Sequence, residues 1–112
     1  MSNTRKRELT RGYKEREKRQ GIFALRCAAT GAVWVASSRD LDKQENGIRF
    51  QLRMGSHMNK PLQAVWNAQG EDAFAFEVLE EIKDDNALLI PALLKERLGH
   101  WLETPGAQKL AG

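Results

Sequence analysis

The sequence has little of several features that mark particular classes of protein. It contains one cysteine, Cys27, so an intramolecular disulfide is excluded. No apolar run approaches the roughly 18 residues that a membrane-spanning helix needs. The chain also does not open with the charged and then apolar segments of a secretory signal peptide. We therefore expect a cytoplasmic protein that does not insert into a membrane.

Aromatic residues are also scarce, at 7% of the 112 residues. The three tryptophans, Trp34, Trp66 and Trp101, are spread along the chain, which indicates three elements that meet around one core. With 41% hydrophobic residues, a chain of this length can bury one modest core. The sequence thus predicts a single domain, and we expect a monomer.

Positive charge is concentrated at the start of the chain. Residues 1–20 hold eight lysines and arginines against three glutamates, whereas residues 21–112 hold ten against twelve acidic residues. A basic arm of this kind can bind nucleic acid by neutralising phosphates. Alternatively, pairs of opposite charge three or four residues apart, such as Glu15 with Lys18 or Arg19, would only keep an exposed helix soluble. The sequence leaves both interpretations open.

Hydrophobic patterning predicts the order of the elements. The expected elements are a helix over 5–18, strands over 22–27 and 32–37, a helix from 41 with apolar positions at Ile48, Phe50 and Leu52, a helix over 59–70, a strand over 73–79 and a helix over 89–102. This order predicts an α/β protein of the α+β type, with helices around a small sheet. The domain then spans 21–103, between a basic helical arm at 1–20 and a flexible tail at 104–112.

Two tripeptides at the start of the domain resemble a known pair of motifs. Gly21-Ile22-Phe23 and, eleven residues later, Trp34-Val35-Ala36 are similar to the paired tripeptides of the GIY-YIG nuclease superfamily. Further matches follow in the family's order: Ser37 to Leu41, His57, the helix from Leu62 to Gly70, and Phe76 to Ile82. The resemblance covers about residues 21–102 and implies a three-stranded antiparallel sheet flanked by helices.

The resemblance also implies an activity, which is phosphodiester hydrolysis with one divalent metal ion, Mg²⁺ or Mn²⁺. In the family, motif tyrosines help to activate water, an arginine stabilises the phosphate and a helix carboxylate holds the metal. In this sequence Phe23 and Trp34 occupy the tyrosine positions, Ala36 the final glycine and Gln44 the arginine. Because Phe has no polar atom and Trp can only donate, the sequence predicts weakened or lost cleavage.

Two further positions match the family's chemistry. Glu96 resembles the metal-binding glutamate, and His57 resembles a histidine of some homing nucleases. Glu96 is equally consistent with a solvated carboxylate, and His57 with a polar loop residue. Glu96 and His100 are too few ligands for a structural zinc site.

We expect the partner to be nucleic acid, with DNA favoured over RNA. The expected contact surface combines the arm with five basic residues near the motifs, Arg39, Lys43, Arg49, Arg53 and Lys60. The sequence therefore predicts an endonuclease-like protein that acts on or binds nucleic acid. The alternatives are a non-catalytic binding module and a protein-interaction domain on the same scaffold.

Overall fold

A computed structural model of the chain describes residues 18–110. The helix predicted in the N-terminal arm lies outside these residues, apart from its last position. The described elements are β1 (Gly21–Cys27), β2 (Val33–Ser38), α2 (Leu41–Arg53), α3 (Lys60–Gln69), η1 (Glu71–Ala73), β3 (Phe74–Glu81), η2 (Ala87–Leu89), α4 (Ile90–Leu102) and β4 (Ala107–Lys109). Within 18–110, none of the helices has the length and apolar character that crossing a membrane requires.

The sheet has four strands in the order β3-β1-β2-β4. β1 pairs antiparallel with both β2 and β3, as the resemblance implies, whereas β4 pairs parallel with the outer edge of β2. The expectation of three strands was therefore wrong by one. The fourth strand lies in the tail that was predicted to be flexible from residue 104. Leu110 is buried at its end, and its backbone N–H donates to the carbonyl of Val35 at 3.0 Å.

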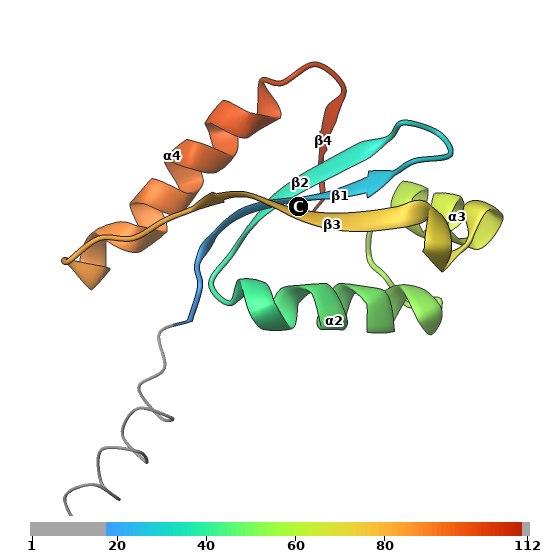
Figure 1. The fold of residues 1–112 in the computed structure, drawn as a ribbon, viewed down its shortest axis with the longest axis horizontal. Coiled ribbons are helices and arrows are strands. Elements are labelled where there is room, and N and C mark those ends of the chain that lie inside the picture. The colour runs from blue at the N-terminus through green and yellow to red at the C-terminus, as the bar shows by residue number, and fades with distance from the viewer. Residues whose placement is uncertain (1–17, 111–112) are drawn as a thin grey trace, which may run out of the picture.

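Helices cover both faces of the sheet, with α4 on one face and α2 and α3 on the other (Figure 1). The alternation of side chains along β1 explains this arrangement. Phe23 and Leu25 point to the face that α2 and α3 cover, while Ile22 and Ala24 point to α4. Both faces of β1 are buried, so this strand is apolar at almost every position.

β1 and β3 approach each other closely at Gly21, the glycine of the first motif, and this approach requires a residue without a side chain. A Cβ at Gly21 would overlap the backbone carbonyl of Glu80 on β3. β1 and β3 also shift register between Ile22 and Phe23. Only glycine allows this contact without displacing β3.

Side-chain caps begin α2 and α3, the two helices that cover the face of the sheet to which Phe23 points. The carboxylate of Asp40 accepts from the backbone N–H of Lys43, and Asn59 accepts from that of Leu62. On α2, Ile48 and Leu52 are buried as predicted, but Phe50 is 61% exposed. The prediction of Phe50 as an inward apolar position was wrong because the helix places it about half a turn away from both neighbours.

Candidate nucleic-acid interface

The two aromatic motif positions are buried inside the domain. Phe23 is fully buried and stacks on Phe76 with ring centroids 4.8 Å apart. Trp34 is 2% exposed and packs against Phe74 on the same face of the sheet. Neither ring reaches solvent, so both contribute to the core under α2 and α3 rather than to a reactive surface.

Gln44, at the position of the family's arginine, is tied to the end of β2. Its Oε1 lies 2.8 Å from the hydroxyl of Ser38, which donates to it. The same hydroxyl oxygen accepts the backbone N–H of Asp40 at 3.0 Å. Gln44 is therefore held on the first turn of α2 in a polar contact, and its side chain carries no charge.

His57 lies in the loop between α2 and α3 and is buried, at 6% exposure. Its backbone N–H donates to Oε1 of Gln63, and its Nδ1 accepts the backbone N–H of Asn59 at 3.0 Å. With Nδ1 acting as an acceptor, the neutral ring carries its proton on Nε2. Burial lowers the pKa of His57 below its ordinary value, which favours this neutral form.

Gln44 and His57 come together on the wall of one cleft of about 580 Å³ between α2, the loop before α3 and β4. The cleft is lined by Gln44, Ile48, Gln51, His57, Met58, Asn59, Lys60, Pro61, Lys109 and Leu110. Two lysines line it, and none of its lining residues within 18–110 carries a carboxylate. A shallower depression beside it shares Gln44, Ile48 and Gln51 and adds Lys43, Gly47 and Asp40.

The five basic residues predicted from the sequence divide into two groups. Arg49 and Arg53 are held by carboxylates: Arg49 donates to Glu45 at 2.9 Å, and Arg53 forms a two-point ion pair with Glu71. Arg39, Lys43 and Lys60 make no ion pair within residues 18–110.

The structure adds Lys109 to the basic residues of this face, where it lines the cleft with Lys60. The carbonyls of Lys109 and Leu110 both accept from the amide of Asn59, so β4 is anchored to the start of α3. Sequence patterning missed Lys109 because a three-residue strand has no periodicity that identifies it.

Glu96 lies apart from the cleft. It is exposed on α4, the helix that covers the other face of the sheet. The orientation of α4 is set by Glu80 on β3, which accepts from Arg97 Nε at 2.8 Å and from Trp101 Nε1 at 2.9 Å. These bonds from Trp101 and Arg97 also hold the pKa of Glu80 below its usual range.

The residues present do not fit the metal centre that the resemblance implies. A divalent ion of this class needs several oxygen or nitrogen ligands, and residues 18–110 contain no group of three His, Cys, Asp or Glu side chains placed to hold one. Glu96 and His57 are on opposite faces of the sheet, so they cannot share an ion. The side chains of the described residues therefore support no catalytic step through a metal.

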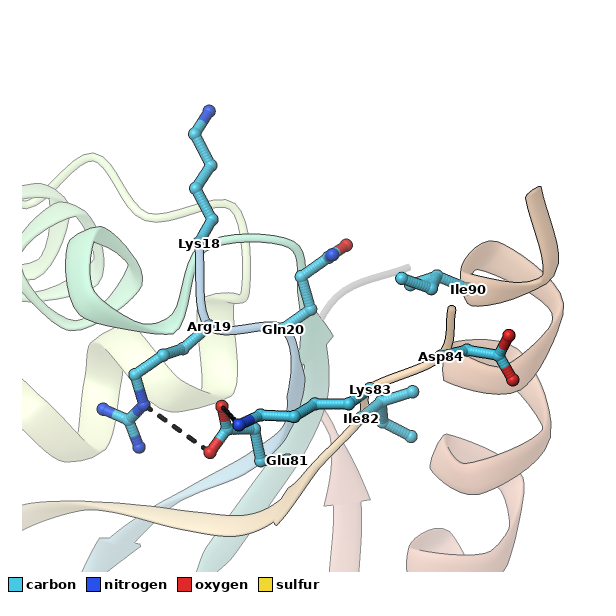
Figure 2. Close-up of a pocket in the computed structure, with 8 residues that line it drawn as sticks. All are labelled: Lys18, Arg19, Gln20, Glu81, Ile82, Lys83, Asp84 and Ile90. Carbon is cyan, nitrogen blue, oxygen red and sulfur yellow. Dashed lines mark ion pairs between the residues drawn. The ribbon is translucent and has the colours of Figure 1, made fainter. Parts of the chain in front are cut away.

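A second depression, of about 340 Å³, lies at the other end of the sheet, between residues 18–20 and the end of β3 (Figure 2). Arg19 and Lys83 both point to the carboxylate of Glu81, at 3.9 Å and 3.7 Å. Asp84 adds a further negative charge to its lining. Lys18 and Arg19 of the predicted basic arm line it, but none of the other site residues predicted from the sequence does.

Comparison with known proteins supports the fold and the motif order. No model of a protein family matches the chain, and no curated protein matches it. Among solved structures, the catalytic domain of homing endonuclease I-TevI is 25% identical with a TM-score of 0.67, over 83% of this chain and 99% of that one. A mutant of the catalytic domain of intron endonuclease I-TevI is 27% identical with a TM-score of 0.65, over 76% and 81%.

These two matches support the fold and the superfamily that the degenerate tripeptides indicated. The chain belongs to the GIY-YIG nuclease superfamily.

Proposed function

We propose that this protein binds the phosphodiester backbone of DNA in the cleft lined by Gln44, His57, Lys60 and Lys109, and that its cleavage activity is weakened or lost. The observation that carries the proposal is the composition of the cleft, which brings two motif positions together with two lysines and, among residues 18–110, no carboxylate. A phosphate entering it meets positive charge without a competing negative charge from the wall.

Three features of the cleft suit a phosphate group. The lysines supply point charges that displace counterions. The neutral ring of His57 has its Nε2–H free of the bond that occupies Nδ1, so it is a donor suited to a phosphate oxygen. Lys43 lies in the adjoining depression and extends the positive charge along α2.

Loss of cleavage follows from the motif positions. Phe23 and Trp34 are buried and cannot relay a proton, and Gln44 cannot offer a charged grip on a phosphate. Removing a single catalytic donor costs roughly 10²-fold or more. Replacement of three such groups together is expected to lower the rate by several orders of magnitude.

The experiment is a salt series of binding measurements with a fluorescently labelled DNA duplex. The slope of log K against log salt is negative. We expect it to become shallower by about 1 when Lys60→Gln or Lys109→Gln removes one phosphate contact. Lys95→Gln is the matched control, because Lys95 is exposed on α4 and changes the net charge equally. Equal effects of all three substitutions would show that only net charge matters and would contradict binding in the cleft.

A second candidate function is metal-dependent cleavage of nucleic acid, because both structural matches are to endonuclease catalytic domains. Nicking of supercoiled plasmid with Mg²⁺ or Mn²⁺ tests it, with wild type compared with Glu96→Ala and His57→Ala. Metal-dependent nicking that one of these substitutions abolishes would establish an enzyme. Binding without nicking, at any metal concentration tried, is the result that the degenerate motifs predict.

A further inference from the structure

Three large apolar side chains are exposed on α2 and in the segment that follows it. Phe50 is 61% exposed, Met54 66% and Met58 90%. We call these three residues the apolar rim. Leu88 and Leu89, at the start of α4 and far along the chain, are the other large apolar side chains exposed in residues 18–110. Exposed aromatic and methionine side chains gathered beside a basic cleft are typical of a binding surface.

Helical geometry places Phe50 and Met54 on the stripe of α2 next to the stripe that lines the cleft. Lys43, Gly47, Phe50 and Met54 recur at spacings of four, three and four residues, so they form one stripe on α2. Gln44, Ile48 and Gln51 form the neighbouring stripe, which lines the cleft. A Cβ at Gly47 would meet nothing within 4 Å, so the stripe is open to a ligand between Lys43 and Phe50.

Met58 completes the rim from the loop that follows α2. Gly55 adopts a positive φ of 72°, and the chain turns back so that the N–H of Ser56 donates to the carbonyl of Gln51 at 2.9 Å. Met58 then lines the cleft together with Lys60. Met58 thus belongs to the cleft with Lys60 and Lys109, and Phe50 and Met54 lie on the stripe of α2 that carries Lys43.

The charges around this surface favour a polyanion over a basic or neutral partner. Lys43, Lys60 and Lys109 lie around it without ion pairs in the described part of the chain. Asp42 is paired with Arg19 and Glu45 with Arg49, and the carboxylate of Asp40, in the adjoining depression, caps α2. A ligand that suits the surface combines phosphates with flat apolar groups.

We propose that the apolar rim stacks against unpaired bases, so that the ligand is single-stranded or locally unpaired nucleic acid rather than intact duplex. The inference rests on the proposed function and adds a substrate class to it. In duplex DNA the faces of the bases are covered by stacking, and a protein meets mainly phosphates. In a single strand the faces are free, and an aromatic side chain adds about 5- to 150-fold in affinity per stacked base.

The test compares one labelled oligonucleotide as a single strand and as a duplex, with wild type, Phe50→Ala and Phe50→Tyr. We expect Phe50→Ala to weaken binding of the single strand about tenfold and of the duplex less than twofold. Phe50→Tyr keeps the ring and is expected to restore binding of the single strand. Leu88→Ala is the control, because it removes an exposed apolar side chain that does not line the cleft. Thermal melting of each variant verifies folding.

The possible outcomes separate the two proposals. Equal loss of single-strand and duplex binding in Phe50→Ala, or no loss in either, would overturn the stacking model while leaving phosphate binding intact. No binding of either nucleic acid by wild type would overturn the proposed function itself. Self-association that Phe50→Ala abolishes, with nucleic-acid binding unchanged, would assign the rim to a protein contact instead.

Discussion

Gln63 holds His57 in place, because its side-chain Oε1 accepts the backbone N–H of His57 at 3.1 Å. The other end of the same amide donates to the carbonyl of Leu52 and to Oδ1 of Asn67, each at 3.0 Å. One buried side chain on α3 therefore joins the last turn of α2 to the loop that carries His57. The position of His57 in the cleft depends on a residue to which the motif comparison gave no role.

Gln63→Leu is expected to destabilise the protein and to displace His57. The substitution leaves the buried N–H of His57 without its partner, which costs about 1–3 kcal/mol. The carbonyl of Leu52 loses the bond from Gln63 but keeps the one from the N–H of Gly55. Chemical denaturation measures the loss, and NMR of the imidazole reports the displacement. Asn67→Ala is the control, because it removes one partner of Gln63 and keeps the bond to His57. An unchanged His57 signal in Gln63→Leu would contradict the positioning role.

The protonation of His57 predicts a pH dependence of stability. Its folded pKa is lowered by burial, and Lys60 and Lys109 line the same cleft, so protonation favours the unfolded chain. Stability is therefore highest above the unfolded pKa of about 6.5 and falls as the pH drops from there towards the folded value. Urea denaturation across this window measures it. His57→Asn should flatten the dependence.

Releasing the arginines of α2 should strengthen nucleic-acid binding. Glu71 engages Arg53 in a two-point ion pair and lies 3.6 Å from Arg49, and the bond from Arg53 keeps the pKa of Glu71 low, so the carboxylate stays charged. Glu71→Gln frees Arg53, which is 56% exposed, and should steepen the salt dependence of binding by about 1.

A matched pair on β1 and β3 controls this measurement. Glu77→Gln frees Arg26 at the junction of β1 and β3 and makes the same change in net charge. If both variants raise the affinity alike, the gain comes from net charge and not from the arginines of α2.

Leu110 is buried near the end of the chain, so we expect its substitution to lower the free energy of unfolding. Leu110 is 7% exposed in the core cluster that contains Trp34 and Ala36. Leu110→Ala should lower the free energy of unfolding by about 2 kcal/mol, the low end for removing a buried leucine, because the residue is near the end of the chain. Denaturant unfolding measures it, with Leu88→Ala as an exposed control. No loss of stability would support the flexible tail that the sequence predicted.

Periodicity predicted most of the described elements. Strands expected over 22–27, 32–37 and 73–79 and helices expected over 59–70 and 89–102 are present, each with ends within two residues of those expected. These elements bury a face whose spacing is local in sequence, so the pattern of apolar residues is sufficient to predict them. The motif order likewise predicted the superfamily, because the tripeptides and the glycine of the first motif reflect how β1, β2 and β3 meet.

The candidate site was predicted less well. The sequence grouped Gln44, His57 and Glu96 as one set of motif positions, but only Gln44 and His57 line the same cleft. Glu96 is on α4, on the opposite face of the sheet. Which face a helix covers depends on the packing of both faces of the sheet, and the spacing of residues within one helix does not contain that information.

The sequence by itself therefore determined the local elements, the superfamily and the replacement of the motif tyrosines, because each is set by residue identity or by short-range spacing. Only the tertiary structure decided that Arg53 is engaged, since its partner Glu71 is 18 residues away in sequence. It also decided that β4 brings Lys109 to the cleft. Long-range packing sets these features, and local propensity does not encode it.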